Sequence, residues 1–284
     1  MRLETVNAIK LSSPPRSGAQ TRGEFWEIPV LFEDDHLLAL DKPAGLLTSP
    51  DRYDPQRPNL MKLLHAAIAG GKPWARERRL TYLMNAHRLD FETSGVLLLA
   101  KDKPTLVALA NLFGSEKPLK KYIALAHGSP KADRFEIDAK LAPHPLKIGL
   151  MRVDAKNGRK SKTQFSILEK FSGYTLLQCE PLTSRIHQIR AHLRHAGLPI
   201  VGDQLYGGKK LWLSRLKLDY RLKPGREERP LLSRVALHAE ALTLPHPVTG
   251  ETMTITAPRP KDLKVALKYL RQFAIGRFEN QRTE

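Results

Sequence analysis

Cysteine and long apolar segments are the scarcest features of this 284-residue chain. Cys179 is the only cysteine, which excludes an internal disulfide and fits a reducing compartment. No stretch of the sequence approaches the roughly 18 apolar residues that a transmembrane helix needs. We therefore expect no membrane span and a cytoplasmic location. The hydrophobic content of 41% is nevertheless sufficient for a folded core.

The first 24 residues lack the apolar centre of a secretory signal. Their arginines and serines are compatible with an organellar transit peptide, but a flexible tail is the simpler interpretation. The sequence contains no internal repeat and no linker that divides the rest of the chain. We therefore expect a tail over 1–24 and one folded domain over 25–284.

Acidic residues are also few, at 29 against 47 lysines and arginines, which gives a formal net charge of +18. The excess of positive charge is distributed unevenly along the sequence. Residues 140–162 contain seven basic residues and one acidic residue, and residues 209–234 contain nine and three. Such patches are typical of proteins that bind a polyanion. Neither patch reads as a basic amphipathic helix with an aromatic face, so nucleic acid is favoured over anionic lipid.

Short apolar runs and turn signals predict strands paired as hairpins, with helices between them. This order predicts an α+β fold, with a mixed, largely antiparallel β-sheet and flanking helices. The expected strands lie within 30–46, 96–100, 119–128, 163–182 and 234–258, and the expected helices within 57–70, 101–117, 184–197 and 261–273.

The stretch HRLDFETSG, residues 87–95, places Asp90 in a basic setting, two residues after Arg88. A carboxylate in a cleft needs a nearby cation to stay ionised, and such a cation lowers its pKa by about 1–3 units. The helix expected from Ser184 carries Ile186, Ile189 and Leu193 on one face and His187, Arg190 and Arg194 on another. Its arginines are candidate partners, although an ordinary amphipathic helix would show the same pattern.

Five ordered blocks carry a family resemblance. They are DKPAGL (41–46), HRLDFETSGVLLLAK (87–101), KKYIAL (120–125), SRIHQIRAHLRHAGLPIVGDQLYG (184–207) and LHAEALTLPHPVTGE (237–251). Together they resemble the RluA-type pseudouridine synthases over roughly residues 30–260. The resemblance implies the pseudouridine synthase fold with a central basic cleft, and it makes 25–284 the catalytic domain with a basic insertion at about 209–234.

The resemblance also implies a reaction. A uridine within an RNA chain is flipped out of its stack, its glycosidic bond is broken, and the base is rejoined through C5. Asp90 matches the family's catalytic aspartate, Arg190 the arginine that pairs with it, and Tyr122 the active-site tyrosine. Whether Asp90 attacks the sugar, attacks the base or removes a C2′ proton stays open.

Further residues are expected to contact the RNA substrate: Arg88, Arg185, His187 and Leu237. The expected partner is ribosomal or transfer RNA, with no obligatory protein partner, and isomerisation requires no cofactor. His87 is expected to brace the loop. The particular RNA and uridine stay open.

The chain departs from the family pattern at three places. Asp41 stands where asparagine is frequent, Phe91 where a basic residue is frequent, and Ser184-Arg185-Ile186 where Gly-Arg-Thr is frequent. Ser184 is a suitable helix N-cap, and none of these changes removes an expected catalytic group.

Metal binding is not expected. His187 and His192 lie on different sides of the expected helix, and Arg190 and Arg194 would repel a cation. A P-loop motif is also lacking. Two other functions remain open: an RNA-binding or ribosome-assembly factor, and a base-removing glycosylase. A glycosylase uses two carboxylates, and the acid nearest to Asp90 in the sequence is Glu92, two residues away.

Overall fold

The computed structural model describes residues 8–13, 24–51, 54–217, 219–222 and 225–274. Internal contacts divide the chain into two compact units, each with its own core. Unit 1 contains residues up to Pro118 together with Ala241–Ala257, and unit 2 contains Leu119–Glu240 together with the residues from Pro258 onward.

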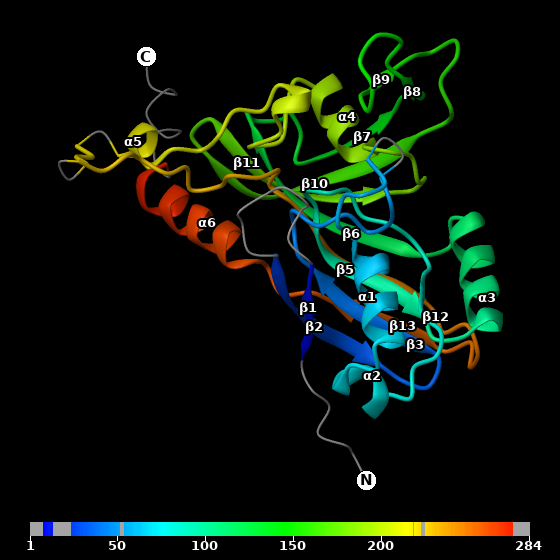
Figure 1. Ribbon diagram of the computed structural model, residues 1–284. Coiled ribbons are helices and arrows are strands. Elements are labelled where there is room, and N and C mark those ends of the chain that lie inside the picture. The colour runs from blue at the N-terminus through cyan, green and yellow to red at the C-terminus, as the bar shows by residue number, and fades with distance from the viewer. Residues whose placement is uncertain (1–7, 14–23, 52–53, 218, 223–224, 275–284) are drawn as a thin grey trace, which may run out of the picture. The chain divides into compact units, whose positions relative to one another are not determined.

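Unit 1 is built on a sheet whose strands run in the order β1-β2-β3-β5-β12, with β13 paired to β12 and β4 paired to β5. Helices α1 and α2 contact each other, and α1 also contacts β1, while α3 packs beside β5 (Figure 1). The bounds are β1 Ala8–Ser12, β2 Phe25–Glu33, β3 Leu37–Lys42, α1 Leu60–Ala69, α2 Pro73–Glu77, β4 Met84–Asn85, β5 Ser94–Ala100, α3 Lys103–Gly114, β12 Leu237–Pro245 and β13 Thr252–Thr256.

Strands β3 and β5 form the buried centre of unit 1. They pair antiparallel with Leu37 opposite Ala100, and every residue of β5 is buried. A run of apolar residues without alternation suits a strand that is covered on both faces. Helix α3 begins as expected at Asp102, whose carboxylate accepts a 2.7 Å hydrogen bond from the backbone N–H of Thr105.

Residues 8–12 fall within the predicted flexible tail, and they form strand β1 instead. The strand pairs antiparallel with β2, and its alternating Ile9 and Leu11 are buried. For these residues the tail prediction was wrong, because a five-residue alternation is too short to stand out in the sequence. The rest of that segment lies outside the described residues.

Unit 2 contains strands in the order β12-β6-β11-β10-β7 and a separate β8–β9 pair. The strands expected within 163–182 form the hairpin β10–β11, which turns at Ser172-Gly173, and α6 packs against the core of unit 2. The bounds are β6 Leu119–His127, β7 Arg134–Asp138, β8 Leu141–Pro143, β9 Met151–Val153, β10 Lys162–Phe171, β11 Tyr174–Pro181, α4 Gln188–His195, the 3-10 helix η1 Gln204–Tyr206, α5 Leu213–Leu216 and α6 Lys261–Phe273.

The basic segment 209–234 has little regular structure where it is described. It contains the one-turn helix α5 and an isolated bridge between Leu211 and Leu232, both of which are buried. Glu228 accepts hydrogen bonds from the backbone N–H and the hydroxyl of Ser214. These contacts join the segment to itself, and Leu211 and Leu232 attach it to unit 2 because both belong to the core of that unit.

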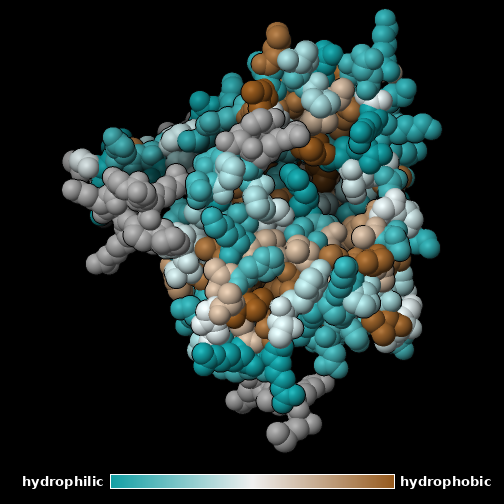
Figure 2. Space-filling model, turned by 45° about the vertical axis from the view of Figure 1, so that its right-hand side comes forward, coloured by the Kyte–Doolittle hydropathy of each residue, from teal (hydrophilic) through white to brown (hydrophobic). Residues whose placement is uncertain are grey.

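The predicted α+β fold is confirmed. The strand pairs whose residue register is defined are antiparallel, and helices flank the strands of both units. Hydrophilic residues cover most of the face shown in Figure 2, with hydrophobic residues scattered among them. The predicted central basic cleft stays a prediction.

Candidate functional site

Asp90 lies in the segment that joins β4 to β5. The backbone N–H of Thr93 donates to the carbonyl of Asp90 at 3.2 Å, which closes a turn over 90–93. On the other side, the hydroxyl of Thr48 donates to the Leu89 carbonyl at 3.0 Å and accepts from the Leu89 N–H at 3.2 Å. The backbone is therefore fixed on both sides of a partly exposed carboxylate.

The DKPAGL loop holds the same turn from a second direction. Gly45, at φ +80°, donates its N–H to the carbonyl of Phe91 at 2.8 Å. The buried Lys42 ammonium donates to the carbonyls of Pro43 and Leu46, each at 2.7 Å. The Arg57 guanidinium lies 4.0 Å from the centre of the Phe91 ring, a cation–π contact. Two of the matched motifs thus form one local structure.

His87 braces this segment, as expected. Its Nε2 accepts a hydrogen bond from the backbone N–H of Leu98 at 3.1 Å, and its ring stacks on Phe113 with 4.9 Å between centroids. The Asn85 amide donates to the His87 carbonyl at 2.9 Å. Arg88, the next residue, is exposed.

Tyr122 lies in β6 of unit 2, opposite Cys179 in β11. It is partly buried and packs against the core of that unit. Two residues earlier, the Lys120 ammonium donates to the Ser184 hydroxyl at 2.6 Å. This bond ties the strand of Tyr122 to the loop that precedes α4.

Helix α4 begins later than predicted. The residues from Ser184 to His187 form a loop, so Ser184 is not the N-cap, and Ile186 is 53% exposed rather than on the core face. The reason is Gln188, whose side-chain oxygen accepts from the Thr183 hydroxyl and the Arg185 N–H. These bonds favour the loop over another helical turn.

Arg190 is buried in α4 and forms a bidentate ion pair with Asp203. The Nε and Nη2 atoms donate to the carboxylate at 2.7 and 2.8 Å, and Asp203 is fully buried. The guanidinium also lies 5.0 Å from the centre of the Tyr206 ring. Sequence reasoning missed Asp203 and Tyr206 as site residues, although both belong to the quoted GDQLYG block.

His187 joins this cluster at the start of α4. Its backbone is left-handed, at φ +52°, and its Nδ1 lies 3.1 Å from the Tyr206 hydroxyl. That hydroxyl accepts a bond from the Met151 N–H at 2.9 Å. Unit 2 therefore brings His187, Arg190, Asp203 and Tyr206 together.

Arg185 and Leu237, two further residues predicted to contact RNA, also belong to unit 2. Arg185 donates from Nη1 to the Ser184 carbonyl at 2.9 Å. Leu237 is 4% exposed and belongs to the core of unit 2. It can therefore offer only an apolar wall to a ligand.

His192, one of the histidines of α4, uses both ring nitrogens within the protein. Both ring nitrogens of His192 have protein partners, since Nε2 donates to the Ala139 carbonyl at 3.0 Å and Nδ1 lies 2.9 Å from the Thr163 hydroxyl. Burial lowers the pKa of this imidazole. Within the described ranges, no group of three metal-ligating side chains is present.

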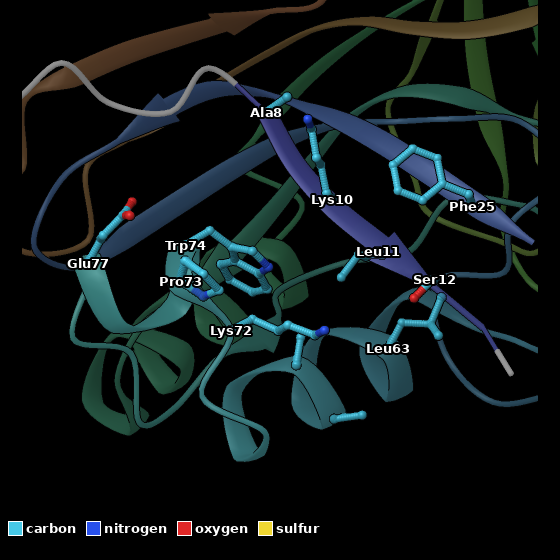
Figure 3. Close-up of a pocket in the computed structure, with 12 residues that line it drawn as sticks. Ala8, Lys10, Leu11, Ser12, Phe25, Leu63, Lys72, Pro73, Trp74 and Glu77 are labelled. Carbon is cyan, nitrogen blue, oxygen red and sulfur yellow. The ribbon is translucent and has the colours of Figure 1, made fainter.

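A cavity of about 480 Å³ lies in unit 1 between β1, α1 and α2. Figure 3 shows Trp74 and Leu11 among the apolar side chains of its wall, and Lys10 and Lys72 among the polar ones. None of the matched motif residues lines it. We assign no chemistry to this cavity.

Comparison with known proteins decides the family. A family model described as RNA pseudouridylate synthase matches residues 36–195. The chain belongs to the RNA pseudouridylate synthase family. The predicted resemblance is thus confirmed, and the chain is an RNA pseudouridine synthase, an isomerase that acts on RNA.

Individual relatives agree with this assignment. Ribosomal large subunit pseudouridine synthase C of Salmonella typhi is 36% identical over 247 residues, which are 86% of this chain and 70% of that protein. Ribosomal large subunit pseudouridine synthase D of Xanthomonas campestris is 36% identical over 258 residues, or 89% of this chain and 73% of that protein. The solved structure of human RNA pseudouridylate synthase domain containing 4 matches this pseudouridine synthase with a TM-score of 0.66 and 26% identity, over 85% of this chain and 92% of the human one.

The described helices of this pseudouridine synthase include none that is both long and apolar enough to cross a membrane.

Proposed function

We propose that this synthase converts specific uridines to pseudouridines in structured ribosomal or transfer RNA, in the cytoplasm. Large-subunit ribosomal RNA is favoured, because the relatives described above carry that target in their names. The single cysteine, which is buried, supports a reducing compartment. The reaction needs no cofactor and no obligatory protein partner.

Asp90 is the proposed catalytic group, and the turn that carries it is the observation on which the proposal depends. Thr48, Gly45 and Thr93 fix the backbone around it. A carboxylate on a fixed backbone can be aimed at one atom of an extruded nucleoside. It would attack the sugar or the base, or remove the C2′ proton.

Arg190 is the proposed partner of Asp90. Asp203 engages Nε and Nη2 of its guanidinium, so Nη1 is the donor that would serve a second carboxylate. A guanidinium at that position would hold the Asp90 carboxylate in one orientation. The planar fork of arginine can bind two carboxylates at fixed angles, which a lysine cannot do.

The remaining predicted residues would hold the RNA. Tyr122 would stack on the flipped base, which repays part of the few kcal/mol that flipping costs. Arg88, Arg185 and His187 would contact the RNA strand, and Leu237 would support the apolar wall behind the base. Residues 25–284 would act as one catalytic domain, with the 209–234 insertion contributing to target choice.

The test uses ribosomal RNA and transfer RNA labelled with tritium at uridine C5, taken from cells that lack the gene. Wild-type protein should release the label, because C5 exchanges its hydrogen for the bond to the sugar. Asp90→Asn, which keeps the shape of the side chain but removes its charge, should abolish release while RNA binding stays near wild type.

Three outcomes would contradict the proposal. Absence of release from either RNA would remove the isomerase assignment. Free uracil and abasic RNA would indicate a glycosylase. Full rescue of a gene deletion by Asp90→Asn would indicate an assembly factor that works through RNA binding alone.

A further inference from the structure

A basic cavity in unit 2 is lined by none of the residues proposed for catalysis, although Tyr206, which contacts Arg190, forms part of its wall. Its volume is about 510 Å³, and it is lined by the last turn of α4, the loop between β8 and β9, and the turn around η1. We call it the α4 basic pocket. Five of its thirteen lining residues are basic and none is acidic: His144, Lys147, Arg152, Arg194 and His195.

Arg194 is held in place at the wall of this pocket. Its Nη1 donates to the Tyr206 carbonyl at 2.8 Å. Gly207 has φ +85°, and a Cβ atom there would lie 2.6 Å from the same Nη1. The glycine therefore leaves the space that the guanidinium needs.

The loop between β8 and β9, together with β9, supplies the basic residues on the other side of the pocket, which are His144, Lys147 and Arg152. The His144 Nδ1 accepts from the backbone N–H groups of Leu146 and Lys147, at 3.2 and 3.1 Å. The neutral ring therefore carries its proton on Nε2, where it can act as a donor. Arg152 is partly neutralised by Asp154, at 2.7 Å.

Lys147 and Arg194 carry the uncompensated charge. Both are exposed, and neither has a carboxylate of the described residues within ion-pair distance. The partial negative charge at the C-terminal end of α4 explains why Arg194 and His195 are favourable there. It does not explain the position of Lys147, which comes from a separate segment. Cations from two separate segments therefore line one pocket, as is expected of a site that binds an anion.

We propose that the α4 basic pocket binds a backbone phosphate of the RNA substrate, mainly through Lys147 and Arg194. The proposal rests on the proposed function and adds a contact outside the uridine site. Leu146 and Ile148 flank Lys147 and are 88% and 77% exposed. Apolar side chains on both sides of a cation suit a nucleic acid strand, whose sugars and bases alternate with phosphates.

The test compares Lys147→Glu with Lys264→Glu, which makes the same charge change on the exposed face of α6. Binding to ribosomal RNA is measured by filter retention over a series of salt concentrations. Lys147→Glu should weaken binding at least tenfold, and Lys264→Glu by no more than about twofold. Lys147→Met, which keeps the aliphatic stem, should lower the slope of log K against log salt by about 0.7–0.9, the loss of one phosphate contact.

Equal weakening by the two glutamate variants would overturn the proposal, because only total charge would then matter. An unchanged slope of log K against log salt for Lys147→Met would also overturn the proposal. Tritium release by the wild-type protein separates the two hypotheses. Release together with equal binding of the variants removes the pocket alone, whereas absence of release removes the proposed function.

Discussion

At the scale of single residues, two arginine–aspartate pairs in unit 2 have the same geometry and different surroundings. Arg190–Asp203 and Arg234–Asp262 are both bidentate, with shortest distances of 2.7 Å. The Asp203 side chain is 0% exposed and that of Asp262 is 37% exposed. A buried charge that loses its partner is costly, while an exposed pair contributes little.

We predict that Asp203→Asn lowers the free energy of unfolding by about 3–5 kcal/mol. Asp262→Asn should lower it by less, about 1–2 kcal/mol, because the lost carboxylate is 37% exposed while the Arg234 side chain that it leaves is 13% exposed. Urea denaturation at pH 7.5 measures both. Similar losses in the two variants would show that burial does not decide the contribution of these pairs.

The sequence predicted single residues unevenly. Motif match predicts Asp90, Tyr122 and Arg190 as catalytic residues, which stays a prediction, and it predicted that His87 braces the loop. Asp203 was not predicted as a site residue, because an aspartate between a glycine and a glutamine usually indicates a surface turn. Only the fold shows that its carboxylate is enclosed.

At the scale of elements, α4 is the helix whose packing the sequence described least well. The amphipathic pattern placed Ile189 and Leu193 correctly in the core, but it extended the helix across Ile186, which is exposed. The periodicity of apolar residues continues through the loop, and a side-chain bond from Gln188 overrides it. The Gln188 amide nitrogen also donates to the Lys162 carbonyl and the Thr163 hydroxyl of β10, and a local pattern does not contain that strand.

His192 links α4 to Thr163 of β10 and to Ala139 through hydrogen bonds. Its Nδ1 faces the Thr163 hydroxyl, which also accepts from the Gln188 amide at 3.0 Å. Burial lowers the pKa of the imidazole in the folded protein. The unfolded chain, with a pKa of about 6.5, binds the proton more readily, so the stability that His192 contributes is present above that pH and is lost as the pH falls below it.

We predict that the free energy of unfolding of the wild type falls between pH 7 and 5.5 more steeply than that of His192→Gln. The difference should not exceed about 1.4 kcal/mol per pH unit, the limit for one proton. Urea denaturation at pH 5.5, 6.5 and 7.5 tests this, with the exposed His195→Gln as the control. Parallel curves for wild type and His192→Gln would contradict it.

At the scale of the whole molecule, charge is the property that composition predicts best. The surplus of +18 and its concentration in 140–162 and 209–234 need no structure to be recognised. The division into two units could not be recognised, because no linker marks it. The chain passes between the units at three places, and one of them, between Glu240 and Ala241, falls inside β12, where a continuous strand gives no compositional signal.

We predict a strong salt dependence of RNA binding by the full chain. If six or more phosphates are neutralised, affinity should fall by about 10³-fold or more between 50 and 200 mM salt. Filter binding with ribosomal RNA measures the slope. A flat curve would show that the basic patches do not contact the RNA backbone.

The path of the chain through β12 also determines the order in which the protein can be completed. Unit 1 begins near the N-terminus, but its strand β13 and its share of β12 come from residues 241–257. A ribosome must therefore synthesise the whole first part of unit 2 before unit 1 can close its sheet. During that interval β5 lacks its neighbour β12, and an open strand edge is a site for pairing with another chain. A nascent chain stalled before residue 241 would consequently keep the edge of β5 open to pairing with another chain.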